Sequence, residues 1–263
     1  MFAAGCGIHP QPRGGIGVKM AEKLPSSGSL PDGQVAGCDT SGMILVHRIF
    51  RWLYRELPLL VRGVDDGDVA RAEIVGVYAD LDFFALHLHH HTEDTVLWDR
   101  LAARRPACAA HVELMRTQHA EVASHLERIE PQLAPWVETA DPERRDAFAG
   151  DIEALRDTLL VHLGREEDDI LPVAGAVMSQ KEWDELEAHT RATLLARRRD
   201  FPRDVLSLQL GLLLASVPEA ERDAWYRANV PAPIRLLYVL LMRRRYDRAM
   251  QELYPGRPVP SMF

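Results

Sequence analysis

From residue 39 onward, apolar residues recur at intervals of three and four, with charged residues between them. This spacing places the apolar side chains on one face of an α-helix, whereas a half-buried strand would alternate every second residue. The pattern predicts helices at about residues 39–60, 68–104, 107–133, 141–172 and 179–199, and further helical stretches after Pro202 and Pro231. Convincing β-hairpin signals are absent, so we expect an all-α fold.

Capping and breaking residues mark the ends of these predicted helices. The segment 39–41, Asp-Thr-Ser, offers N-caps for the first helix, and the segment 179–182, Ser-Gln-Lys-Glu, has the capping-box order for the fifth. Pro142 suits the first turn of the fourth helix. We expect Pro131 and Pro135 to bound the third helix, because proline cannot donate a backbone hydrogen bond.

The pattern divides the chain into three parts. Residues 1–40 are rich in Gly, Pro and Ser and show no periodicity, so we expect a flexible N-terminal arm. Residues 41–175 hold the first four helices, and residues 176–263 are expected to form a helical extension packed on them or on a partner. Met20 offers a second start, which leaves open whether residues 1–19 belong to the native product.

Composition and charge argue against several classes of protein. The 263 residues include 31 Lys and Arg against 39 Asp and Glu, and this formal charge of −8 does not favour a nucleic-acid partner. Cys6, Cys38 and Cys108 lack CxxC spacing, which argues against a disulfide framework and fits the cytoplasm, where we expect the protein. The apolar runs are too short for a transmembrane segment, which needs roughly 18 residues.

Two apolar runs in the C-terminal extension, residues 206–214 and 234–242, need a covering surface. We expect them to dock against the first four helices. A homodimer contact is the alternative, and binding to a membrane surface is the least favoured interpretation.

Each of the first four predicted helices carries a histidine among the residues of its apolar face. These histidines are His47, His89, His119 and His162. A lone histidine in such a position is more often a hydrogen-bonded core residue than a ligand. Two of the helices add a glutamate four residues after the histidine, Glu93 and Glu166, and this spacing places both side chains on one helix face.

Glu93 and Glu166 make the case for a metal. A carboxylate in an apolar face costs several kcal/mol unless it is paired or bound to a metal. Cationic residues are missing from the four apolar faces near this pair, so a buried salt bridge explains it poorly. Imidazoles and carboxylates without thiolates favour iron or manganese over structural zinc. Histidine never follows a glutamate by three residues, which separates the chain from ferritin-like bundles that use Glu-x-x-His.

The combined pattern resembles a hemerythrin-type (HHE cation-binding) domain over about residues 40–175. The motifs are His47, the segment 89–94 (His-His-His-Thr-Glu-Asp), the segment 118–119 (Gln-His) and the segment 162–167 (His-Leu-Gly-Arg-Glu-Glu) followed by Ile-Leu-Pro. The resemblance implies an up-down four-helix bundle with additional C-terminal helices. It also implies two non-heme iron ions, although manganese and zinc stay open as the physiological metal.

By the same resemblance, roles are expected for single residues. His47 and His89 would hold one iron, His119 and His162 would hold the other, and Glu93 and Glu166 would bridge them. His90 lies about 60° around the helix from Glu93 and is a further ligand candidate. Glu167 competes with Glu166 as the bridge, because typical family members place this carboxylate five residues after the histidine. Periodicity favours Glu166.

The chain departs from the oxygen-carrying members of the family on the third helix. Those proteins have a second histidine there, one turn from the first, where this chain has Met115 and Ala123. Reversible oxygen transport is therefore not favoured. We predict His87 and His91 on the outer face of the second helix, and His189 in an exposed position on the fifth.

Two functions follow as expectations. The first is a di-iron protein that binds or processes a small ligand, O2, peroxide or NO, with enzymatic turnover left open and no catalytic residue assigned. The alternative is a non-enzymatic module that binds iron or senses iron or oxygen and signals through its C-terminal helices. A helical interaction protein with incidental histidines would bind no iron.

Overall fold

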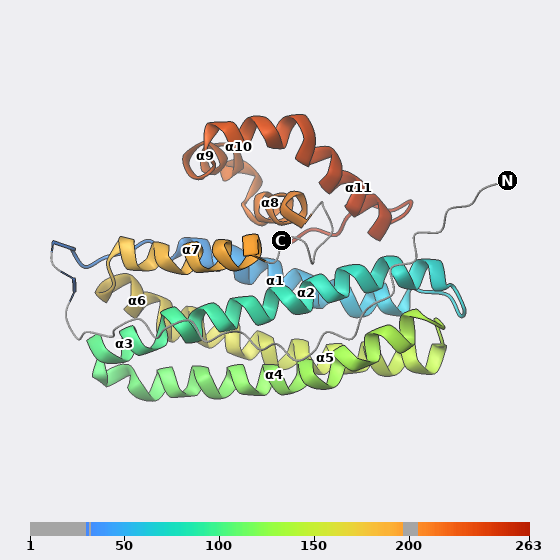
Figure 1. Cartoon of the computed structure of the whole chain (residues 1–263), viewed down its shortest axis with the longest axis horizontal. Helices are drawn as coiled ribbons and strands as arrows, with labels where there is room; N and C mark the ends of the chain where they lie inside the picture. The colour runs from blue at the N-terminus through green and yellow to red at the C-terminus, as the bar shows by residue number, and fades with distance from the viewer. Residues whose placement is uncertain (1–29, 32, 197–204) are drawn as a thin grey trace.

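The computed structural model describes residues 30–31, 33–196 and 205–263, and helices dominate this part of the chain (Figure 1). The longer helices are α1 (Ser41–Arg62), α2 (Val69–Val96), α4 (Ala109–Val137), α5 (Pro142–Arg165), α7 (Gln180–Ala196), α8 (Val205–Ser216), α9 (Glu219–Asn229) and α11 (Arg243–Leu253). The shorter ones are α3 (Trp98–Arg104), α6 (Leu171–Val177) and α10 (Ala232–Leu237). Within the described residues, the β pairing is limited to an isolated bridge between Gly37 and Ser179. The predicted all-α fold is confirmed.

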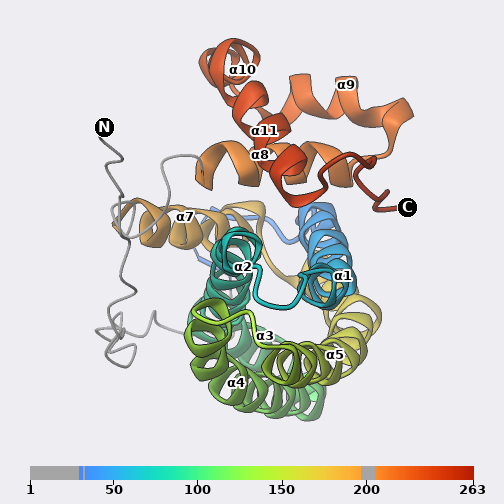
Figure 2. The same cartoon turned by 90° about the vertical axis from the view of Figure 1, so that its right-hand side faces the viewer.

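Four of these helices form the bundle. Seen end-on in Figure 2, α1, α2, α4 and α5 surround a common core, with α5 packed against both α1 and α4, and α4 packed against α2. Their inward faces carry fully buried side chains such as Leu86, Leu155 and Leu159. The bundle with additional helices is the architecture that the sequence predicted.

Pro131 and Pro135 do not end the third predicted helix, because α4 continues through both of them. Proline in a helix interior removes a backbone hydrogen bond and costs roughly 3 kcal/mol. Burial of Trp136 offsets part of this cost, since its side chain is 0% exposed and its ring lies 5.3 Å from the ring of Phe148. Packing in the bundle therefore overrides the local preference that the prediction used.

The second and fourth predicted helices are real but interrupted. The second, predicted over residues 68–104, is divided at Leu97 into α2 and α3. After α5, a π-helical turn (η2, Glu166–Ile170) widens the helix before α6 begins. Pro172 then falls in the first turn of α6, where a missing backbone N–H is tolerated, so the helix predicted to end there continues.

α7 lies beside α2, outside the ring of four. The predicted capping box opens it, since the backbone N–H of Ser179 donates to Glu182 Oε2 at 3.1 Å and that of Glu182 donates to Ser179 Oγ at 3.3 Å. Arg104 of α3 donates to both carboxylate oxygens of Glu182 in a buried ion pair. Arg199, the predicted end of this helix, lies outside the described residues.

The helices α8 to α11 form a C-terminal lobe against one side of the bundle (Figure 1). α8 packs against α1, and Leu208 and Leu212 join the core of the bundle. Leu208 and Leu212 of the apolar run 206–214 thus pack against the bundle.

The second apolar run does not follow that expectation. α10, the π-helical turn η3 (Tyr238–Met242) and α11 pack onto α8 and bury Tyr238 and Met242. Leu236, Val239 and Leu240 stay 61%, 62% and 58% exposed. The physical reason is geometric, because η3 packs on α8, and α8 in turn packs on α1 of the bundle. None of the described helices is long and apolar enough to cross a membrane.

The end of the predicted N-terminal arm is fixed to α6. The backbone N–H of Gly37 donates to Met178 O at 2.8 Å, and that of Cys38 donates to Gly175 O at 3.0 Å. Outside the described residues lie residues 1–29 and 32 of the predicted arm, which include Cys6. Cys38 and Cys108 are free thiols.

Candidate metal centre

Five imidazoles and two carboxylates meet in the interior of the bundle. They belong to His47 on α1, His89, His90 and Glu93 on α2, His119 on α4, and His162 and Glu166 at the end of α5 and the start of η2. Side chains four residues apart share a helix face, which is why each glutamate points the same way as the histidine before it. Each of the four helices of the bundle thus contributes at least one candidate ligand.

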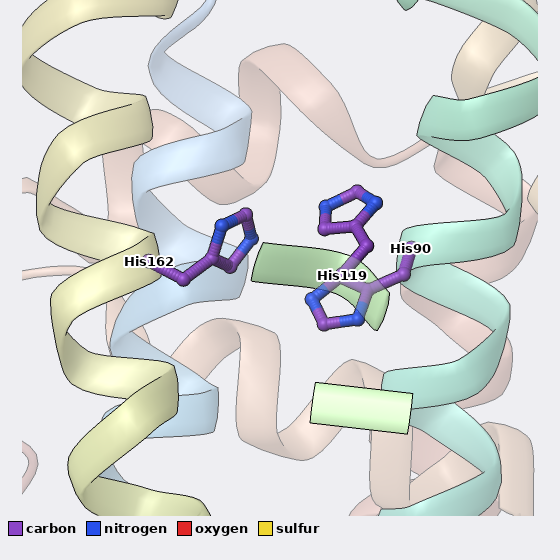
Figure 3. Close-up of side chains that lie close together, drawn as sticks. All are labelled: His90, His119 and His162. Carbon is purple, nitrogen blue, oxygen red and sulfur yellow. The ribbon is translucent and has the colours of Figure 1, made fainter. Parts of the chain in front are cut away.

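The candidate ligand atoms form two groups, and within each group they lie within 4.8 Å of one another. One group comprises His47, His89, Glu93 and Glu166, and the other comprises His90, His119 and His162. Figure 3 shows the three imidazoles of the second group converging from α2, α4 and α5. We name them the two-histidine group and the three-histidine group. Further clusters of this kind are absent from the described part of the chain.

The two glutamates connect the groups. Glu93 lies 3.3 Å from His89 Nε2 through Oε1 and 3.4 Å from His119 Nε2 through Oε2. Glu166 Oε2 lies 3.5 Å from His47 Nε2 and 3.6 Å from His162 Nε2. Each carboxylate therefore stands between one histidine of each group, which is the arrangement that a bridging ligand requires.

Many polar atoms of this cluster are buried without a hydrogen-bond partner. They are Nε2 of His47, His89, His90 and His119, both ring nitrogens of His162, and both carboxylate oxygens of Glu93 and of Glu166. Buried polar groups are almost always paired, because an unpaired one costs roughly 1–3 kcal/mol. Lone pairs of nitrogen and oxygen that face one another at these distances repel, and a cation between them removes the repulsion. The residues present thus fit metal ions.

The protonation states point the same way. Burial raises the pKa of Glu166 to about 8, and the neighbouring Glu93 carboxylate adds to this shift. Burial, with His119 and His47 nearby, lowers the pKa of His162 to about 2, and burial also lowers those of His89 and His90. His119 differs: burial lowers its pKa, but the hydrogen bonds with Asp94 and Glu93 outweigh burial and raise it to about 9, so a metal would displace a proton from this ring. Neutral imidazoles are the form that binds a metal, and positive charge at the centre would favour the ionised carboxylates.

His90 supplies the imidazole that the third predicted helix does not. Met115, one turn before His119, is fully buried in an apolar cluster. From α2, the ring of His90 stacks on that of His119 at 4.1 Å, His90 belongs to the three-histidine group, and its Nε2 is buried without a hydrogen-bond partner. The sequence indicated this role for His90, because His90 lies about 60° around the helix from Glu93. A residue at that angle lies at the edge of the buried face, where its side chain can still reach the core.

Glu166 and Glu167 take different positions. The carboxylate of Glu166 is 0% exposed and lies in the two-histidine group. Glu167 is 22% exposed and accepts a hydrogen bond from His47 Nδ1 at 2.9 Å, on the side of that ring away from the centre. The side chain in reach of both groups is therefore that of Glu166.

The remaining histidines on α2 and α7 lie outside the centre. His87 pairs with Glu130 at 2.7 Å on the surface between α2 and α4. His91 faces α7, where its ring lies 5.8 Å from that of His189. His189 was predicted to be exposed, and this prediction is wrong, because α7 packs against α2 and half-buries the ring.

An open groove leads to the three-histidine group between α2 and α4. It has a volume of about 540 Å³, and His90, His119 and Asp94 form part of its lining. Asp99 and Arg116 form an ion pair beside it, with Arg116 NH2 2.5 Å from Asp99 Oδ1. Small molecules can therefore approach the His90 and His119 residues from solvent, although the centre-facing Nε2 atoms are buried.

Comparison with known proteins agrees with this geometry. The family model described as the hemerythrin HHE cation binding domain matches residues 40–174. Searches of curated proteins and of solved structures gave no match. The matched segment contains all seven candidate ligands and ends within α6.

Proposed function

This chain belongs to the hemerythrin HHE cation-binding domain family, and we propose that its bundle holds two non-heme iron ions that bind or process O2, peroxide or NO. The two-histidine group would hold one ion and the three-histidine group the other, with Glu93 and Glu166 as bridges. The observation that carries this proposal is the set of buried nitrogen and oxygen atoms without hydrogen-bond partners.

The donor set supports iron over the alternatives. Seven imidazole and carboxylate ligands shared between two positions suit iron or manganese, whereas structural zinc is held by four ligands that usually include thiolates. Cys38 and Cys108 belong to neither group. Of the two metals, Fe²⁺ binds O2 and NO more readily than Mn²⁺ does, and we therefore propose iron.

A pair of iron ions would supply a Lewis acid, redox equivalents and an open position for a small ligand. The residues of this chain do the rest. Leu86, Leu159 and Met115, all 0% exposed, exclude water from the surroundings of the centre. The groove beside His90 and His119 admits a small molecule from solvent. Cytoplasmic location is part of the proposal and rests on the cysteine usage.

Metal analysis of the purified full-length chain, together with an optical spectrum, tests the proposal. We expect about two iron ions per chain for wild type, one for each ligand group, and much less in the double variant Glu93→Ala/Glu166→Ala. Asp82→Asn is the matched control, because Asp82 is a buried carboxyl of α2 that lies outside both groups. Unchanged iron content in the double variant would contradict the bridging role.

Titration of the iron-loaded protein with O2, peroxide and NO then separates binding from turnover. Consumption of peroxide or NO in proportion to the iron content supports an enzyme. A spectral change without consumption supports a binding protein. Absence of any change with all three ligands contradicts the proposed function.

An iron or oxygen sensor is the second candidate, and one observation favours it. α1 carries His47 on its inner face and holds the C-terminal lobe with its outer face. Arg48 donates to Ser216 O, Trp52 Nε1 donates to Pro260 O at 2.9 Å, and Arg55 NH2 donates to Ser261 O at 2.7 Å. A shift of α1 on metal binding would therefore reach the lobe directly.

Hydrogen–deuterium exchange of the metal-free and metal-loaded full-length chain tests the sensor. If α1 transmits the metal state, loss of the metal will weaken protection in α8 and at residues 259–263 as well as around the centre. A change confined to residues 41–175 contradicts the sensor and leaves the first function in place.

A further inference from the structure

Each of the two candidate bridging glutamates is followed directly by a second acidic residue. Asp94 follows Glu93 on α2, and Glu167 follows Glu166 in η2. Successive residues on a helix point about 100° apart, so one member of each pair faces the centre and the other faces a neighbouring helix. The two outward acids make the same kind of contact.

Asp94 reaches α4. Its Oδ1 accepts a hydrogen bond from His119 Nδ1 at 2.9 Å and another from the indole Nε1 of Trp98 at 2.9 Å. The side chain of Asp94 is 45% exposed, because it lies at the groove that leads to the three-histidine group.

Glu167 reaches α1. Its Oε1 accepts from His47 Nδ1 at 2.9 Å and from the guanidinium of Arg51 at 2.6 Å. Glu167 is 22% exposed, so this contact is more enclosed than that of Asp94. Arg51 holds the carboxylate in place and neutralises its charge.

The two contacts have the same consequence for the rings. A carboxylate accepts a hydrogen bond from Nδ1–H, which keeps the proton on Nδ1 and leaves the lone pair on Nε2 for a metal. His47 Nε2 and His119 Nε2 are the ring atoms that face the centre, and both are buried without a hydrogen-bond partner. By contrast, both ring nitrogens of His162 lack such a partner.

We propose that Asp94 and Glu167 are positioning residues that fix the tautomer and orientation of His119 and His47 for metal binding. This inference rests on the proposed metal centre and adds what holds two of its ligands. α1 and α4 each contribute a single ligand, so a residue on the neighbouring helix orients each of these lone histidines. When such a partner of a ligating histidine is removed, the metal affinity of the site typically falls by about 10–100-fold.

The experiment measures metal affinity in the full-length chain by competition between the metal-free protein and a chelator for Fe²⁺ under anaerobic conditions. Asp94→Ala and Glu167→Ala are each expected to weaken binding of one ion by about 10–100-fold, with the larger loss for the more enclosed Glu167. Asp94→Asn and Glu167→Gln retain an acceptor oxygen and are expected to lose less. Asp168→Asn, the exposed neighbour of Glu167, is the matched control and should bind as wild type does.

A second readout separates positioning from general stability. In the zinc-loaded protein, which is diamagnetic, NMR of the imidazoles should show slowly exchanging Nδ1–H protons for His47 and His119. Asp94→Ala should remove the His119 signal alone, and Glu167→Ala the His47 signal alone. The isosteric Asn and Gln variants keep the test available should an Ala variant not fold.

The outcomes distinguish this inference from the centre itself. A wild-type chain that binds no metal overturns the proposed function and this inference with it. Wild type that binds two ions, with unchanged affinity and unchanged Nδ1–H signals in both Ala variants, overturns the positioning role alone.

Discussion

The bundle and the C-terminal lobe differ in how completely they cover their apolar residues. In the bundle, Leu86, Met115 and Leu159 are 0% exposed, although imidazoles and carboxylates share the same core. In the lobe, Leu236 and Val239 remain 61% and 62% exposed. Each helix of the bundle has a neighbour on either side because the four close a ring, whereas the segment of α10 and η3 that carries Leu236 and Val239 packs on α8 and α9 with one side only. Closure of the ring, and not apolar content alone, decides burial.

The largest effect that we expect is a cavity in the bundle. Trp136→Ala removes a ring that is 0% exposed, and substitutions of this kind cost about 3–5 kcal/mol. Chemical denaturation of the variant measures the free energy of unfolding. Loss of less than about 1 kcal/mol would mean that the end of α4 is not as tightly packed as the bundle's geometry requires.

Metal removal is expected to come next. At a free iron concentration 100 times the dissociation constant, binding stabilises the folded state by about 2.7 kcal/mol. We expect this stabilisation in the bundle, because the candidate metal ligands all lie there. We expect little of it in residues 219–253. Calorimetry with and without chelator gives the total, and hydrogen exchange assigns it to a region. Equal destabilisation of the bundle and of residues 219–253 on metal removal would contradict this expectation.

A smaller effect is expected from acid at the contact between α3 and α7. Burial alone would raise the pKa of Glu182. The hydrogen bonds from Arg104 and Ser179 outweigh burial and lower this pKa from 4.5 to about 2. A lowered folded-state pKa stabilises above pH 4.5, and that contribution disappears as the pH falls toward 2. Glu182→Gln should cost about 1–3 kcal/mol at pH 7 and nearly nothing at pH 2.

Exposed Glu187→Gln is the control for this pH dependence, because Glu187 is 78% exposed and lies on the same helix. A cost of Glu182→Gln that does not shrink between pH 5 and pH 2 would show that the charge of Glu182 is not what joins the two helices.

The smallest effect is expected in the lobe. Leu240→Gln changes a side chain that is 58% exposed, so the free energy of unfolding should stay within about 0.5 kcal/mol of wild type. Thermal unfolding at low protein concentration measures it. A cost comparable to that of Trp136→Ala would mean that Leu240 is covered in solution.

The sequence predicts the bundle well because its signals are local and periodic. The cap at Ser179, the proline in the first turn of α5 at Pro142 and the apolar faces follow from side-chain chemistry within a few residues. The path of the chain through Pro131 and Pro135 does not, since it depends on where Trp136 packs in three dimensions. The exposure of most of the run 234–242 escapes prediction for the same reason, since it depends on how η3 packs on α8.

The candidate centre shows the same division. The i,i+4 pairs place Glu93 and Glu166 inward, and one turn of helix suffices for that prediction. His90 joins the three-histidine group because of how α2 is rotated about its own axis in the bundle. The periodicity of the sequence gives that rotation only approximately. The contact of His189 with His91 depends on α7, whose docking site has no local signal.

The π-helical turn at residues 166–170 gives this segment room for an extra residue between two α-helices. A π turn holds one residue more than an α-helix does over the same path. Deleting exposed Asp168 would therefore return the segment to α-helical geometry over the same path, and Ile170 would keep its place in the core, in which it is 0% exposed. Homologous chains can thus differ by one residue across this segment and still place the residues after it on the same helix face.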